Sequence, residues 1–202
     1  LLKATVLVPT PGALEMLEAA ARGIVTLARE DDAAVALRLE RAGEQLAKDL
    51  EGPDGARIGI TFVRMAVDLF KDGEWAWRAL DRAIAADADV DEYLNLAPFA
   101  GAFAAAPGAA EGLARVMAEV EKPYSNVGHA LLRLVGAIAR ELGDQEKRAK
   151  AFVRAAEKES DDDQIVVDAD DAIVASQNPA YLERLNKRAG NFRRTEALRA
   201  VA

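Results

Sequence analysis

Few residues of this chain could perform chemistry. His129 is the only histidine, and there are no cysteines. No partner for His129 lies at the spacing of a metal site, and no Ser–His–Asp arrangement or glycine-rich phosphate loop is present. We therefore expect no catalytic residue, no metal and no cofactor, and we interpret His129 as the start of a helix beside Asn126. The pattern favours a protein that is not an enzyme.

The acidic run from Asp87 to Glu92 has the spacing of a calcium-binding loop at its start, with carboxylates at Asp87, Asp89 and Asp91. However, Glu92 occupies the position at which such loops need glycine, and Pro98 occupies the position of the bidentate glutamate. We therefore reject a calcium site here. The run is better explained as a solvated loop followed by the start of a helix.

A second acidic cluster lies later in the chain and comprises Asp161, Asp162, Asp163, Asp168, Asp170 and Asp171. It could hold cations weakly. Carboxylates also stabilise the positive N-terminal end of a helix, and this is the role that we favour for the cluster.

The C-terminal segment is basic, and its cationic residues are Arg184, Lys187, Arg188, Arg193, Arg194 and Arg199. It could dock an acidic partner or, with a neighbouring domain, nucleic acid. The interpretation that we favour is a solvated terminal helix, from about Arg193 to the end, that covers the last apolar face of the domain. The net charge of −8 argues against a broad nucleic-acid-binding surface.

The composition predicts an all-α fold. Of the 202 residues, 51% are hydrophobic and 30% are charged, and good helix formers dominate over β-branched residues. No apolar run reaches the length of a membrane span. The chain begins at Leu1 rather than Met, so we expect that a signal peptide or an upstream domain has been removed. Residues 1–11 are interpreted as a linker or remnant, and residues 12–202 as a single helical domain.

Four helix-break signals recur at intervals of about 35 residues, namely Gly73-Glu74, Pro107-Gly108, Gly143-Asp144 and Asn178-Pro179. A period of this length accommodates one helix–turn–helix unit and is typical of stacked repeats. We therefore predict a right-handed α-solenoid of about ten helices in antiparallel pairs. The alternative, an irregular all-α bundle in which the breaks recur by chance, stays open.

Several local features are also predicted. Residues 52–55, Gly-Pro-Asp-Gly, form the strongest turn signal of the chain. A helix is expected over residues 94–106, and its Ala-rich part is expected to be buried. Asp144 and Asn178 should cap the helices that follow them. Trp75 and Trp77 cannot share one helix face, so one is expected in the core, and the other should cover the next unit or anchor a partner.

Small residues repeat after two of the breaks: Ala79 and Ala86 follow Gly73 at +6 and +13, and Ala149 and Ala156 follow Gly143 at the same offsets. Such residues allow two helices to approach closely.

With Gly136, Gly143, Asp144 and Phe152, this pattern resembles the tetratricopeptide repeat family, most clearly over residues 130–162. The alanines lie one residue later than in the usual pattern, which implies a lengthened turn. The resemblance covers about residues 58–162. It implies an array that binds a partner in a concave groove built from the first helix of each unit.

We therefore expect a non-enzymatic interaction module, an adaptor or scaffold that binds a protein or peptide. Arg133, Ala137 and Arg140 should project into the groove, with Asp168 in the next unit. The arginines suit an acidic or C-terminal carboxylate ligand, although the family's paired Lys and Asn clamp is not visible. Two alternatives stay open: a sensory or regulatory domain of a larger protein whose effector domain lies upstream, and an all-helical enzyme.

Overall fold

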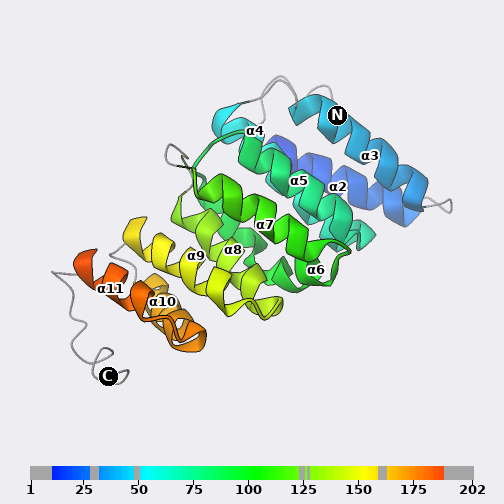
Figure 1. The fold of residues 1–202 in the computed structure, drawn as a ribbon. Helices are drawn as coiled ribbons and strands as arrows, with labels where there is room; N and C mark the ends of the chain where they lie inside the picture. The colour runs from blue at the N-terminus through cyan, green and yellow to red at the C-terminus, as the bar shows by residue number, and fades with distance from the viewer. Residues whose placement is uncertain are drawn as a thin grey trace.

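The computed structural model describes residues 11–27, 32–47, 51–122, 126, 128–158 and 163–188. Within these ranges the only regular elements are helices, joined by short turns, and there is no β-strand, so the prediction of an all-α fold is confirmed (Figure 1). Residues 1–10 of the segment expected to be a linker (residues 1–11) lie outside the described residues, and Pro11 already belongs to a helix. The expected terminal basic helix (residues 193–202) also lies outside the described residues.

The described residues form ten α-helices, one π-helical turn (η1) and one 3-10 helix (η2). Their bounds are α2 Pro11–Leu27, α3 Asp32–Ala47, α4 Gly52–Met65, η1 Ala66–Phe70, α5 Gly73–Ala85, η2 Asp91–Phe99, α6 Ala100–Ala105, α7 Ala109–Val120, α8 His129–Glu141, α9 Gln145–Lys158, α10 Asp163–Ser176 and α11 Pro179–Arg188.

The recurring breaks have a common backbone geometry. Lys71, Gly108, Gly143 and Gln177 all have a left-handed φ, between 55° and 73°. This conformation reverses the chain at the end of a helix, and glycine adopts it without steric strain. Three of the four are followed at once by an N-cap of the next helix: Asp72, Asp144 and Asn178. Their side-chain oxygens accept hydrogen bonds from the first-turn amides, at 2.9, 3.0 and 3.1 Å.

The expected caps Asp144 and Asn178 are thereby confirmed, but the first break was misplaced. Gly73 does not end a helix; it is the first residue of α5, and the chain reverses two residues earlier, at Lys71. The prediction was wrong because a left-handed lysine leaves no signal in the sequence. Gly73 serves a different purpose, since a Cβ atom there would come within 2.6 Å of the Ala106 Cβ atom.

Two further predictions were wrong in detail. The Gly52–Pro53 turn signal is the first turn of α4, where proline is well tolerated because it needs no amide hydrogen bond. The helix expected over residues 94–106 is a 3-10 helix up to Phe99, because Pro98 cannot donate within an α-helix. In the Ala-rich part only Ala100 and Phe103 are buried.

Helices that are adjacent in sequence form the most extensive contacts, namely α4 with α5, α8 with α9, and α9 with α10. Beyond these, α2 contacts α4, η2 contacts both α4 and α8, α5 contacts α7, and α9 contacts α11. Figure 1 shows α3, α5, α7, α9 and α11 following one another across the molecule. We call these five helices the outer row, and α2, α4, η2, α6, α8 and α10 the inner row.

A series of ion pairs connects each helix of the outer row with the next one. In every case the acidic residue belongs to the earlier helix, or to the residue just after it, and the basic residue to the later helix. The pairs, called here the outer-row ladder, are Glu40–Arg78 (2.5 Å), Asp81–Arg115 (3.0 Å), Glu121–Lys150 (2.5 Å) and Glu157–Arg184 (2.6 Å).

Three other side-chain contacts join residues that are 35 positions apart: Arg57 with Glu92, Arg133 with Asp168, and Tyr181 with Glu146. The first two have the same order, with an arginine on one helix of the inner row and a carboxylate one period later. Residues separated by the sequence period therefore lie side by side in three places.

The two tryptophans are both buried, at 2% and 3% exposure, but they pack in different directions. Trp75 contacts the rings of Phe62 and Phe70, within its own helix pair. Trp77 meets Phe103 edge-on, and its indole N–H donates to the Phe103 carbonyl oxygen at 3.0 Å. Both tryptophans therefore belong to the core, Trp77 packs against Phe103 of α6, and neither is available as an exposed anchor.

Candidate functional site

The structure brings together two of the three residues expected to bind a partner. An Nη2 atom of Arg133 on α8 lies 3.4 Å from an Oδ2 atom of Asp168 on α10, and both side chains are about three-quarters buried. Arg140 is not part of this pair; it is exposed and contacts the neighbouring Glu141 at 3.3 Å. Ala137, expected to face the groove, is only 8% exposed. Arg133 therefore has a structural role between helices that the sequence argument left out.

A pocket lies elsewhere on the inner row, between α2, α4 and η2. Its volume is about 190 Å³. We call it the inner-row pocket, and its lining residues are Leu14, Glu15, Glu18, Arg57, Ile60, Thr61, Arg64, Glu92 and Asn95. It therefore combines residues from three segments that are far apart in the sequence.

Helical periodicity places the lining residues of α4 together. Arg57, Ile60, Thr61 and Arg64 follow one another at steps of three, one and three, which keeps them on one helix face. Ile60 and Thr61 are buried at 4% and 6% exposure, and the Thr61 hydroxyl donates to the Arg57 carbonyl oxygen at 2.9 Å. Leu14 from α2 is also buried. The pocket thus has an apolar floor with an arginine at each end of the α4 face.

Each of these arginines is held by a carboxylate from another element. Arg57 Nε donates to Glu92 Oε1 on η2 at 2.6 Å, and Arg64 Nη2 lies 3.2 Å from Glu18 Oε2 on α2. The hydrogen bond to Glu92 raises the pKa of the Arg57 guanidinium. Burial alone would raise the pKa of Glu92, but the hydrogen bond from Arg57, a backbone hydrogen bond and the positive charge of Arg57 together outweigh it, and the pKa of Glu92 is lowered. The Arg57–Glu92 pair is therefore charged at neutral pH.

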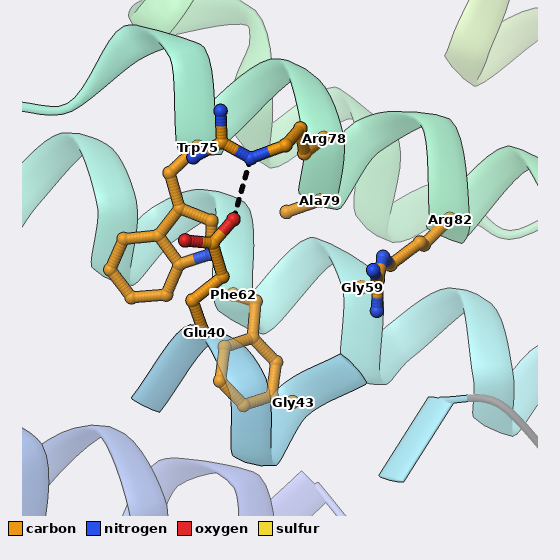
Figure 2. Close-up of a pocket in the computed structure, with 8 residues that line it drawn as sticks. All are labelled: Glu40, Gly43, Gly59, Phe62, Trp75, Arg78, Ala79 and Arg82. Carbon is orange, nitrogen blue, oxygen red and sulfur yellow. Dashed lines mark hydrogen bonds and ion pairs between the residues drawn. The ribbon is translucent and has the colours of Figure 1, made fainter. Parts of the chain in front are cut away.

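A second pocket lies between α3, α4 and α5, and Figure 2 shows its lining, with the Glu40–Arg78 pair. Its volume is only about 10 Å³, close to that of one water molecule. Gly43 and Gly59 let the three helices approach closely, which leaves little space between them. A Cβ atom at Gly43 would come within 2.6 Å of Phe62, and one at Gly59 within 2.6 Å of Ala83. This pocket is a packing feature of the helix crossing, without room for a ligand.

His129 begins α8, as expected from the sequence. Its Nε2 atom lies 4.0 Å from Asp91 Oδ1, and nearby Asn126 donates to both oxygens of Asp87 through its backbone amide and its side chain, at 3.2 and 3.0 Å. These contacts attach the loop before η2 to the start of α8. In the ranges that the structure covers, no three acidic, histidine or cysteine side chains are arranged to hold a metal ion.

The structure describes part of the acidic cluster at residues 161–171 and part of the basic C-terminal segment. Asp163 is the first residue of α10, as expected for an acidic helix start, and residues 161 and 162 lie outside the described residues. In the basic segment, Arg184 forms a two-point contact with Glu157 at 2.6 and 2.8 Å. Arg193, Arg194 and Arg199 lie outside the described residues, so the terminal helix favoured for this segment and its alternative docking role both stay predictions.

Sequence reasoning missed the inner-row pocket, although one signal for it was present. Arg57 and Arg64 are seven residues apart on one helix, as Arg133 and Arg140 are. A carboxylate follows Arg57 after one period, at Glu92, as Asp168 follows Arg133. Two arginines seven residues apart indicated a binding face on α8, and the same spacing could have indicated one on α4. Nothing in the sequence indicated that Glu15 and Glu18 of α2 would lie against α4.

Among the residues that the structure describes, no helix is both long and apolar enough to cross a membrane. No family model matches the chain, and neither a curated protein nor a solved structure shows significant similarity to it.

Proposed function

We propose that the chain is a right-handed α-solenoid of antiparallel helix pairs, similar in plan to the tetratricopeptide repeat. The four left-handed breaks at 71, 108, 143 and 177 and the side-chain pairs at 35-residue separation support this proposal. The outer-row ladder supports it too, since each rung connects successive units in the same acid-to-base order.

The proposed function is that of a non-enzymatic interaction module, an adaptor or scaffold that binds a peptide or protein on its inner row. The observation that carries this proposal is the inner-row pocket. Its volume of about 190 Å³ lies below the range of about 300–1,000 Å³ typical of small-molecule sites. A pocket of this size, with an apolar floor and charged walls, suits one side chain of a longer ligand.

The residues first expected to bind a partner fit the same surface. Arg133, Arg140 and Asp168 belong to α8 and α10 of the inner row, and contacts from α4 through η2 to α8 connect them with the pocket. An extended peptide that places one side chain in the pocket could continue along this row towards Arg140. The exposed Arg140 is the better candidate for a second contact, because Arg133 is already held by Asp168.

Selection of a displayed random peptide library on the purified protein tests this function. Asn95 is exposed at the rim of the pocket, so Asn95→Trp should close the pocket without disturbing the core. Ala110→Trp, at an exposed position of α7, is the matched control. We expect selected peptides to bind the parent and the control equally and the Asn95 variant at least tenfold more weakly.

Two results would contradict the proposal in different ways. Equal binding to both tryptophan variants would show that the peptides bind outside the inner-row pocket. A library that yields no peptide above background would remove the support for peptide binding itself.

A further inference from the structure

The inner-row pocket has an unequal charge balance. Its lining contains the carboxylates of Glu15, Glu18 and Glu92 but only two guanidinium groups, those of Arg57 and Arg64. The lining therefore carries one net negative charge. A negatively charged lining favours a cationic ligand, whereas the sequence-based expectation, which used the arginines of α8, was an acidic ligand.

Both guanidinium groups of the pocket are already paired. Arg57 contacts Glu92 at 2.6 Å and Asp54 at 3.6 Å, and Arg64 contacts Glu18 at 3.2 Å. An incoming carboxylate would have to displace one of these protein carboxylates, and little binding energy would be gained by the exchange. The pocket is therefore a poor site for an acidic side chain.

Two polar groups of the pocket lack a partner among the described residues, and each has an oxygen atom that can accept a hydrogen bond. Glu15 forms no hydrogen bond or ion pair with the residues that the structure describes, and neither does the side-chain amide of Asn95. Both residues are exposed at the rim, on α2 and η2 respectively. The Glu15 carboxylate and the Asn95 amide oxygen can each accept a hydrogen bond from a cation between α2 and η2.

The floor below this rim is aliphatic. The side chains of Leu14 and Ile60 are buried at 7% and 4% exposure, and the Thr61 hydroxyl is directed to its own helix. A side chain that covers this floor and reaches the rim needs an apolar stem and a charged end. Lysine combines the two, because its methylene stem packs on apolar surface while its ammonium group stays in a polar environment.

Given the peptide-binding function proposed above, we infer that the inner-row pocket binds a lysine side chain of the partner. Its methylene groups would pack on Leu14 and Ile60, and its ammonium group would donate to Glu15 and Asn95. The chain as a whole has a net charge of −8, which also favours the approach of a cationic segment.

Three small probes test this inference by nuclear magnetic resonance: the Nα-acetyl N-methylamides of lysine, norleucine and glutamate. Norleucine has the same aliphatic stem without the ammonium group, so it isolates the contribution of the charge. The measured quantity is the shift of the Leu14 and Ile60 methyl signals during titration to about 50 mM, a range suited to millimolar dissociation constants. We expect the lysine probe to bind at least about tenfold more tightly than norleucine, with an advantage that decreases as salt is added.

Variants at Glu15 show how much of the lysine binding depends on the charge of the pocket and how much on its shape. Glu15→Gln should remove most of the preference for lysine over norleucine, and Glu15→Lys should abolish binding of the lysine probe. The matched control is Glu119→Gln, on the exposed surface of α7, which should leave every titration unchanged.

The possible outcomes distinguish this inference from the proposed function. If norleucine binds as tightly as lysine, or if glutamate binds best, the inference of a lysine site is wrong, but the pocket still accepts a side chain. If no probe moves the Leu14 or Ile60 signals, the lysine inference fails and the pocket is not a side-chain site. The peptide-library result then decides separately whether the protein binds peptides at all.

Discussion

The contact between α4 and α5 depends on the absence of a side chain at Gly59. A Cβ atom at this position would come within 2.6 Å of the Ala83 Cβ atom and 2.8 Å of its Cα and backbone nitrogen. Two of these three atoms belong to the backbone of α5, so a side-chain rotation cannot relieve the overlap. Gly59→Ala must therefore move one helix relative to the other.

Two opposing terms determine the size of the effect. Replacing glycine by alanine inside a helix stabilises it by about 1 kcal/mol, whereas overpacking a core costs about 1–3 kcal/mol. Because the overlap at Gly59 involves backbone atoms, we use the upper part of this range and expect a net loss of about 2 kcal/mol. For a chain of this length that corresponds to a melting temperature lower by about 4–8 °C.

Gly23 provides the matched control. It lies inside α2, and no atom comes within 4 Å of a Cβ atom built there. Gly23→Ala should therefore show only the helix-propensity term and raise the melting temperature by about 2–4 °C. The assay is thermal unfolding followed by circular dichroism at 222 nm. If Gly59→Ala melts at or above the temperature of Gly23→Ala, the close approach of α4 and α5 is refuted.

Three further predictions concern packing, charge and pH. Ala79→Leu and Ala149→Leu should each lower the free energy of unfolding by about 1–3 kcal/mol in urea titrations, because both alanines are buried at 4% and 0% exposure; two unchanged midpoints would contradict the packing. A double-mutant cycle of Arg133→Ala and Asp168→Ala should give a coupling energy of about 0.5–3 kcal/mol, the range for residues in contact, and a coupling energy of zero would show that the pair adds no stability. Burial opposes ionisation of Asp144, but hydrogen bonds from Lys147 lower its pKa overall, so Asp144→Asn should destabilise the protein at pH 7 and progressively less as the pH falls below about 4; a pH-independent difference would contradict this.

Much of the fold was predictable because helix faces and helix ends are encoded locally. Leu131, Leu134, Val135 and Ile138 repeat with the helical period, and all four are buried. The N-cap Asp144 could be identified because its short side chain and the preceding glycine are both typical of a helix boundary. These signals depend only on near neighbours in the sequence.

The errors arose where the residue types do not specify one backbone conformation. Lys71 and Gln177 adopt the left-handed conformation without being glycine or asparagine, the residues that usually indicate it. Local hydrogen bonds close both turns, from the Asp72 amide to the Ala66 carbonyl oxygen and from the Gln177 amide to the Ile173 carbonyl oxygen, and the residue types at 71 and 177 do not indicate them. Similarly, Gly52 and Pro53 were interpreted as a turn, although the same residue types are common at the start of a helix.

The candidate site was less predictable than the fold for a related reason. The inner-row pocket joins Glu15 on α2 with Arg57 on α4 and Asn95 on η2, so its position depends on how helices stack. Helical periodicity identifies which face of α4 carries arginines, but not which carboxylates they meet. Only the 35-residue period could have related Arg57 to Glu92 in advance.

The outer-row ladder has a consequence for how the molecule unfolds. Its rungs connect helices of successive units, and their arginine and lysine side chains are 37–55% exposed. Salt therefore weakens the rungs, and least those of Glu40 and Glu157, whose side chains are only 14% and 13% exposed. The buried contacts inside each helix pair are nearly unaffected by salt. In a linear array, cooperativity depends on the coupling between neighbours relative to the intrinsic stability of each unit. In the proposed array, added salt should therefore make the unfolding transition less sharp, and the terminal units should separate from the centre first.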